Sequence, residues 1–221
     1  MVRVAPINGI TYNFEKVKPE DVIAPPYDVI SSEEQDKLYN LSPYNIVRLI
    51  LGKVYSDDNE SNNRYTRAAE TFNNWLDEEV LVKSEKPCIY YYVQNYTTND
   101  GKSISRKGFI AKNYIEKYDE GNVLPHEYTM GGPKEDRLNL MKACGANFSQ
   151  IFMTYSDPGG EIDKAIKIAG EPLLDVVDEQ GIQNIVYAID DDEVINNVKK
   201  LMEDKTVLIA DGHHRYETSI A

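Results

Sequence analysis

The sequence is poor in cysteine and in long apolar runs. Its two cysteines, Cys88 and Cys144, lie far apart and match no metal-binding or redox spacing, so we expect a reduced, cytoplasmic protein. No apolar stretch approaches the roughly 20 residues that a membrane span needs, and the first residues lack the apolar run of a signal peptide. We therefore expect neither a disulfide-stabilised secreted domain nor a membrane protein.

Positive charge is also scarce. Lysine and arginine number 24 against 37 aspartate and glutamate residues, which gives a net charge of −13. Residues 171–221 alone hold 4 basic and 12 acidic side chains. Proteins that bind a nucleic acid backbone carry a basic stripe, and the sequence shows none, so we expect no nucleic acid partner. Solvated acidic helix faces explain most of the acidic excess.

The common nucleotide-binding and hydrolase signatures are missing as well. The sequence contains no P-loop, no G-x-G-x-x-G fingerprint, no nucleophile elbow and no H-E-x-x-H zinc motif. No segment repeats with a period of about 20–50 residues, which excludes a solenoid or a propeller. A functional site must therefore be sought in less common patterns.

The sequence does contain an alternation of helical and extended segments. Capping patterns and helical apolar spacing predict helices over 31–41, 62–80, 135–143, 161–169 and from about 190. Aromatic and β-branched runs predict strands over 45–51, 87–97, 103–115, 151–155, 173–177, 185–189 and 206–210. The Asp100-Gly101 pair predicts a hairpin turn between the second and third of these strands, and the acidic run 190–193 suits the start of the last helix in the list. We expect an α+β fold, a mixed β-sheet with flanking helices, in a single compact unit over residues 1–221. A last helix that stops at Ala221 without a cap predicts that the protein continues beyond it.

The sharpest local pattern is the run Asp211-Gly212-His213-His214-Arg215, which follows the predicted strand 206–210. A strand, a glycine turn and a helix start direct backbone N–H groups toward one point, a geometry that binds phosphate. Gly212 allows the phosphate to approach closely, and Arg215 can contact it through two donors. Asp211 can hold Mg²⁺ or orient one of the histidines. The alternatives are an aspartate cap with exposed histidines and a surface ion pair, or a zinc site.

A second pattern follows Pro125, where a glycine pair precedes two cations. Glu127 is a candidate base or metal ligand. Lys134 and Arg137 are three residues apart, so both can lie on one side of a helix start and clamp a phosphate. The glycine pair at 131–132 suits a loop that closes over a ligand. A polar loop followed by surface charges is the alternative.

Two further features are a proline bend and a cation in an apolar run. The Pro25-Pro26 pair delivers Tyr27 and Asp28 at a fixed place, although a plain loop that enters the next helix gives the same pattern. Arg48 lies within the apolar run 45–51, where a buried cation needs a partner.

These patterns carry a resemblance to a known family. Seven runs, in the same order along the whole chain, resemble the domain-of-unknown-function family 1015: APPYDVIS, SPYNIVRL, KGFIA, LPHEYT, PKEDRLNLM, ANFSQIFMTY and ADGHHRYET. The last run is similar to the nucleotide-phosphate motif of the ParB/sulfiredoxin superfamily, which implies a ParB/sulfiredoxin-like core near the C-terminal end. That superfamily includes sulfiredoxin, free serine kinases and ParB-type clamps. The resemblance implies that Gly212, His214 and Arg215 contact phosphates, and it places His213 where sulfiredoxin carries its catalytic cysteine.

Taken together, these features predict a nucleotide-dependent phosphotransferase that uses ATP or ADP with Mg²⁺ and acts on a small metabolite. Phosphoryl transfer needs mainly positioning and neutralisation of charge. The residues that can supply it are Arg215, Lys134 and Arg137, with Asp211 as the Mg²⁺ ligand. Serine is the expected acceptor by resemblance to the free serine kinases alone.

The predicted catalytic residues are a base and its alternatives. Glu127 or Asp28 would accept the proton of the acceptor's hydroxyl group, and His213 is a third candidate. Two other functions remain open. One is a ParB-like nucleotide-binding module without small-molecule turnover, and the other is a fragment whose site the rest of the protein completes.

Overall fold

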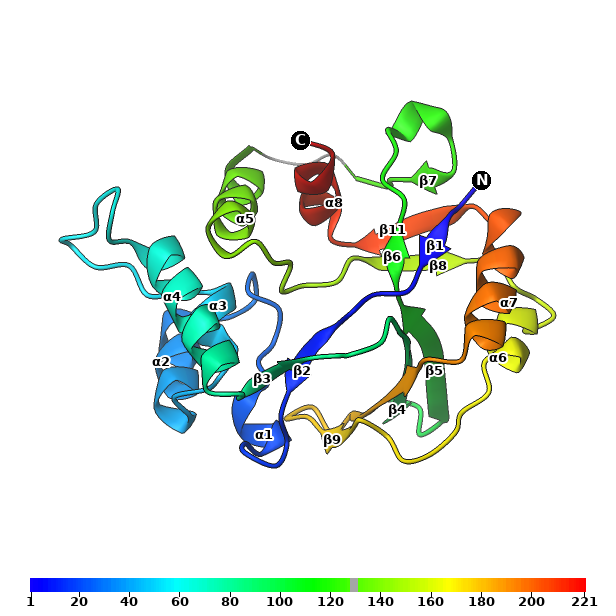
Figure 1. Ribbon diagram of the computed structural model, residues 1–221, viewed down its shortest axis with the longest axis horizontal. Coiled ribbons are helices and arrows are strands. Elements are labelled where there is room, and N and C mark those ends of the chain that lie inside the picture. The colour runs from blue at the N-terminus through cyan, green and yellow to red at the C-terminus, as the bar shows by residue number, and fades with distance from the viewer. Residues whose placement is uncertain (128–130) are drawn as a thin grey trace. The chain divides into compact units, whose positions relative to one another are not determined.

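The computed structural model describes residues 1–127 and 131–221 and shows helices together with several small sheets (Figure 1). This confirms the predicted α+β fold. The chain forms two compact units, each assembled from three separate stretches. Unit 1 comprises Met1–Gly9, Lys83–His126 and Phe152–Asp211, and unit 2 comprises Ile10–Val82, Glu127–Ile151 and Gly212–Ala221. That the two units make one compact body stays a prediction.

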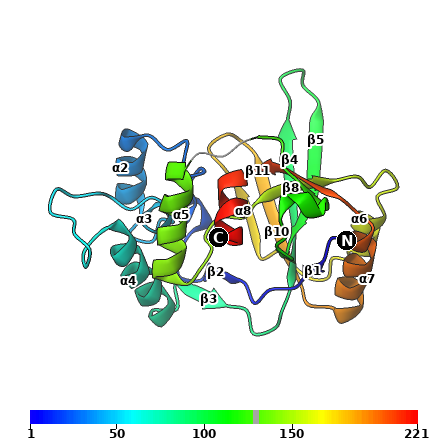
Figure 2. The same ribbon diagram turned by 90° about the horizontal axis from the view of Figure 1, so that it is seen from above.

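The larger sheet of unit 1 is antiparallel and has the strand order β5-β4-β10-β9. Its longest pairing is the hairpin of β4 (Ile89–Thr97) and β5 (Ser103–Ile110), which the aromatic run and the Asp-Gly turn predict (Figure 2). Gly101 closes the turn with a φ of +81°, a conformation that favours glycine. Strand β10 (Gln183–Ile189) continues the sheet and pairs with β9 (Leu174–Val177).

A smaller mixed sheet of unit 1 leads to the predicted phosphate motif. Its middle strand β11 (Val207–Asp211) runs parallel to β7 (Val123–Leu124) and antiparallel to β8 (Phe152–Tyr155). Helix α7 (Asp192–Glu203) precedes β11 and is capped by Asp191, as the acidic run predicts. The other elements of unit 1 are β1 (Val4–Ala5), β6 (Lys112–Asn113), the 3₁₀ turn η1 (Tyr118–Glu120) and α6 (Glu161–Ala165).

Unit 2 is mainly helical. Its helices are α1 (Pro19–Val22), α2 (Ser32–Leu41), α3 (Val47–Ile50), α4 (Arg64–Asp77), α5 (Gly131–Cys144) and α8 (His213–Ile220). Two short strands, β2 (Ile10–Tyr12) and β3 (Leu81–Lys83), pair with each other. Helix α5 packs against α4 and against α8 (Figures 1 and 2). One buried core cluster of the unit consists of Leu49, Phe72, Trp75, Val80 and Leu81.

Helix α3 lies where the sequence predicts a strand over 45–51. Asn45 explains the difference, because its fully buried side chain organises the turn that starts the helix. Its amide donates to the carbonyls of Asp21 and Ile23, both at 2.9 Å, and its Oδ1 accepts from the Val47 N–H at 3.0 Å. A short apolar run that is buried on several sides has no period that separates helix from strand.

Helix α5 begins at Gly131, four residues before its predicted start at 135. The glycine pair at 131–132, predicted to lie in a loop that closes over a ligand, therefore belongs to this helix. The first N–H groups of a helix have no acceptor within it, so the proline at 133 is compatible with the first turn. Thr129 and its neighbours 128 and 130, which belong to the predicted loop, lie outside the described residues. Within residues 1–127 and 131–221, every helix is too short or too polar to cross a membrane.

Candidate functional site

The predicted site residues are divided between the two units. Asp211 belongs to unit 1, where it is exposed at the end of β11 after a register irregularity opposite β8. His126 is also part of unit 1, and its Nδ1 lies 2.6 Å from the carbonyl oxygen of Ile209. The residues that unit 2 brings together are Asp28, Glu127, Lys134, Arg137, Gly212, His213, His214 and Arg215.

Helix α8 starts directly after Gly212, as the sequence predicts. Gly212 has a φ of +94°, which is strained for any residue with a Cβ. The surroundings of Gly212 also disfavour a side chain, because a Cβ at this position would come 2.9 Å from the guanidinium carbon of Arg215. Arg215 thus folds back over the turn, and its Nη1 donates to the carbonyl oxygen of Gln150. The result is a cation held against the N-terminal turn of a helix.

His213 and Glu127 form a pair inside unit 2. The Nδ1 of His213 lies 2.9 Å from Oε1 of Glu127. The imidazole is fully buried, whereas the glutamate side chain is 53% exposed. The carboxylate is therefore the member of the pair that can meet a substrate. The histidine holds it in place, which is the arrangement of a base oriented by a third group.

Lys134 adds a second cation beside helix α8. Its Nζ lies 2.8 Å from Oε2 of Glu217, one turn beyond His213. The hydroxyl of Thr218 donates to the His214 carbonyl at 2.7 Å and also lies 3.3 Å from the backbone carbonyl oxygen of Lys134. His214 itself is partly exposed. Lys134 thus places an ammonium group beside α8, where Glu217 balances its charge.

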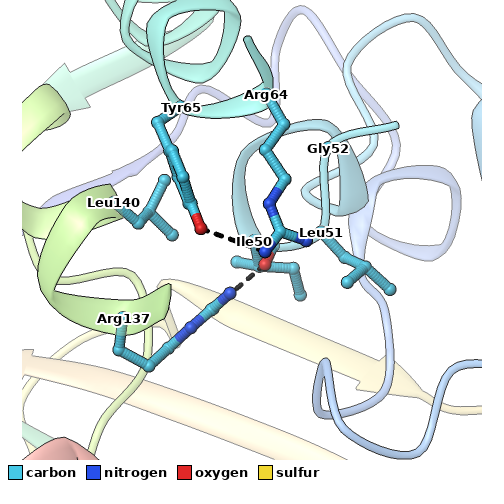
Figure 3. A pocket seen from close by; sticks show the side chains of 7 residues that line it. All are labelled: Ile50, Leu51, Gly52, Arg64, Tyr65, Arg137 and Leu140. Atoms are coloured by element: carbon cyan, nitrogen blue, oxygen red, sulfur yellow. Dashed lines mark hydrogen bonds between the residues drawn. The ribbon is translucent and has the colours of Figure 1, made fainter. Parts of the chain in front are cut away.

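Arg137 is buried and held by three groups. Its Nη1 donates to the Ile50 carbonyl at 3.0 Å (Figure 3). Its Nε, at 2.8 Å, and its Nη2 both donate to Asp136. The guanidinium carbon also lies 3.8 Å from the centre of the Tyr27 ring, a cation–π distance. Arg137 thus fixes Tyr27 and the adjacent, exposed Asp28. At least three of its five N–H donors are committed within the protein.

Asp136 connects Arg137 to helix α4. It accepts a hydrogen bond of 2.8 Å from the Tyr65 hydroxyl and forms ion pairs with Arg64 and Arg137. Burial alone would raise the pKa of Asp136, but the hydrogen bonds from Tyr65 and Arg137 and the two guanidinium charges outweigh it, so this pKa lies below its usual value. Figure 3 shows Arg64, Tyr65 and Arg137 around a pocket of about 10 Å³, which is room for one water molecule.

Tyr27 lies close enough to Arg137 and Arg215 for both charges to affect its phenol. Burial raises the pKa of its phenol, Arg137 and Arg215 lower it, and Asp28 and Asp136 raise it, with a net increase. The phenol therefore keeps its proton at neutral pH and can donate a hydrogen bond to an anion.

Sequence reasoning did not identify Arg64, Tyr65 and Glu217 as neighbours of the site. No local pattern links Arg64 to Asp136, which is 72 positions away. The sequence offers only weaker signals: two acids between two cations in the run 134–137, and a tyrosine placed directly after a rigid Pro-Pro pair.

The model of a protein family described as "protein of unknown function (DUF1015)" matches residues 4–221. No curated protein and no solved structure matches the chain. The description of this family assigns no chemistry to its members.

Proposed function

The chain belongs to the DUF1015 family, and we propose that it is a nucleotide-dependent phosphotransferase whose phosphate site is the start of helix α8. ATP or ADP would place its phosphates at Gly212–Arg215. The observation that carries this proposal is the Arg215 guanidinium lying over the backbone of Gly212. This places a two-donor cation at the positive end of a helix, where two independent attractions for a phosphate add up.

The charges around helix α8 suit phosphoryl transfer, which depends on positioning and on neutralising negative charge. Arg215 is placed for the phosphate nearest the turn, and Lys134 lies one helical turn further along. Arg137, whose charge Asp136 balances, holds Tyr27, whose phenol is a further donor. Asp211, the residue before the turn, is the proposed Mg²⁺ ligand, since Mg²⁺ commonly takes one or two carboxylates together with phosphate oxygens.

Glu127 is the proposed base, and the buried His213 contacts its carboxylate. The acceptor hydroxyl gives its proton to the Glu127 carboxylate while its oxygen attacks the terminal phosphorus of the nucleotide. The bond between that phosphorus and the bridging oxygen breaks, and the shortened nucleotide leaves with the electron pair. His213 keeps the carboxylate oriented. Asp28 is the second candidate base, His214 a further phosphate contact, and serine the first acceptor to test because of the free serine kinase resemblance.

Replacing Arg215 by alanine should weaken Mg-ATP binding by about 1.5–3 kcal/mol, or roughly 10- to 150-fold, the range for a charge-assisted hydrogen bond. The reason is the loss of the guanidinium that lies on the turn. Isothermal titration calorimetry on the full protein measures the change. The exposed Arg106 of unit 1 provides the control, because Arg106→Ala removes the same charge from the chain at a distant position in the sequence. Equal affinities for Mg-ATP in the Arg215 variant and the wild type would remove the proposed phosphate site.

The charge of the chain separates this proposal from a ParB-like module. With a net charge of −13 and an acidic last quarter, the protein should not retain duplex DNA at physiological salt. A gel-shift titration with and without ATP tests this. A complex that survives physiological salt would favour a ParB-like nucleotide-binding module and would count against a phosphotransferase.

A further inference from the structure

A second concentration of positive charge lines a pocket between helices α3 and α4 of unit 2. Its volume is about 140 Å³, close to that of a protein cavity that holds a single benzene molecule. The cluster is opposite in sign to the net charge of the chain. The lining residues that carry charge or an aromatic ring are Arg48, Lys53, Arg64, Arg67, Tyr39 and Tyr55.

Three of these cations form ion pairs with carboxylates. Asp36 and Asp58 each balance one cation, whereas Asp136 is shared between Arg64 and the buried Arg137. The pairs are Lys53 with Asp36 at 2.5 Å, Arg67 with Asp58 at 2.7 and 3.0 Å, and Arg64 with Asp136.

Arg48 differs from the other three. Among the described residues, no carboxylate forms an ion pair with it. Its Nη2 donates to the Tyr39 carbonyl at 2.7 Å, its Nε reaches the Ser42 carbonyl at 3.4 Å, and its guanidinium lies 4.4 Å from the centre of the Tyr39 ring. Carbonyl oxygens and an aromatic face satisfy donors, but they do not neutralise a charge. The pocket therefore holds at least one positive charge more than its neighbouring acids balance.

The aromatic rings of the pocket form cation–π contacts with the lining cations. Arg48 and Lys53 both lie over the ring of Tyr39, at 4.4 and 4.8 Å, and Arg67 lies over Tyr55 at 4.7 Å. These ring faces are occupied, so they do not offer a stacking surface to an aromatic ligand. They fix long, flexible cations in place, which lowers the entropy lost when an anion binds.

We propose that this pocket binds a small phosphate-bearing ligand, either inorganic phosphate or a phosphomonoester with a few carbon atoms, and that Arg48 is its principal contact. The planar guanidinium matches two phosphate oxygens, and the ammonium of Lys53 supports it as a point charge. The pocket uses none of the residues at the start of helix α8, so this second site does not depend on the proposed transferase activity.

The experiment is a calorimetric titration of the full protein with inorganic phosphate and with glycerol phosphate. Arg48→Gln should weaken binding at this site at least about tenfold, because the uncompensated charge is lost. Lys37→Gln removes one charge from an exposed position on the neighbouring helix α2 and should change affinity by less than about threefold.

A second pair of variants does not touch Arg48. Thr71 lines the pocket from helix α4, and glutamate and glutamine at this position have the same shape but differ in charge. Thr71→Glu should weaken phosphate binding at least about tenfold relative to Thr71→Gln, because it adds a fixed negative charge. These two Thr71 variants test whether phosphate binds in the pocket even if Arg48→Gln fails to fold.

The two proposed phosphate sites are distinguished in an Arg215→Ala background. Binding that persists there and disappears on adding Arg48→Gln supports the second site, whatever becomes of the first. Three results would overturn the second site. Phosphate binding could be lost through Arg215→Ala alone, it could be insensitive to Arg48→Gln and Thr71→Glu, or it could be absent from the wild type. None of these outcomes decides whether ATP binds at helix α8.

Discussion

Glu127→Gln should reduce phosphoryl transfer by about 100-fold or more, the usual size for the loss of a general base, while nucleotide affinity stays unchanged. The amide keeps the shape of the side chain and can still contact His213, but it cannot accept the proton of an acceptor hydroxyl. Because Glu127 is 53% exposed and its partner is fully buried, the effect should fall on the carboxylate and leave the packing of helix α8 intact. The measurement is the transfer rate from ATP or ADP to hydroxyl-bearing amino acids, with serine first, alongside calorimetry.

Glu135→Gln is the matched control, because it makes the same chemical change at an exposed position on helix α5. Its transfer rate should equal that of the wild type. A rate within a few-fold of the wild type in Glu127→Gln would show that Glu127 is not the base, and Asp28 would then be tested in the same way. If neither ATP nor ADP transferred a phosphoryl group to any acceptor offered, the result would favour a nucleotide-binding module without turnover.

Asp136→Asn should lower the free energy of unfolding by about 3 kcal/mol. The aspartate pairs with a nearly buried cation, Arg137, and with the partly exposed Arg64, so its removal leaves positive charge without compensation. The value lies at the lower end of the range for buried pairs because water still reaches Arg64. Chemical denaturation at neutral pH measures the loss. Asp36→Asn, which breaks the more exposed pair with Lys53, should cost far less.

The same variant tests the lowered pKa of Asp136. A carboxyl whose pKa is depressed in the folded protein stabilises it above the unfolded value of about 3.9, and this contribution disappears as the pH falls through the folded value. The difference in stability between wild type and Asp136→Asn should therefore be complete at pH 7 and shrink below about pH 4. A difference that is constant from pH 7 to pH 3 would contradict the ion-pair explanation.

Local signals in the sequence predict the local structure well. The Asp-Gly turn, the cap of helix α7 and the strand–glycine–helix turn at Gly212 each depend on residues that are close in the chain. The predicted strand over 45–51 is wrong because the start of helix α3 depends on Asn45, whose partners Asp21 and Ile23 come from another segment. A pattern within the run 45–51 contains no information about them.

The same limit applies to the site. The spacing of Lys134 and Arg137 predicts a shared side of a helix start, but spacing does not show which neighbours each side chain meets. Packing of α5 against α4 and α8 gives Lys134 a partner on α8, Glu217, and buries Arg137 against Tyr27. Both residues thus stay near the proposed phosphate site, and only the tertiary structure shows that one is partly exposed and the other buried.

A crystal structure of the full protein with ADP and Mg²⁺ tests the proposed phosphate site directly. We expect phosphate oxygens within about 3 Å of the Arg215 guanidinium and of the N–H groups in the first turn of helix α8. We also expect the Nη1 of Arg215 to turn from the Gln150 carbonyl toward the phosphate. Phosphates bound at another place, with Arg215 still on Gln150, would show that the start of helix α8 is not the phosphate site.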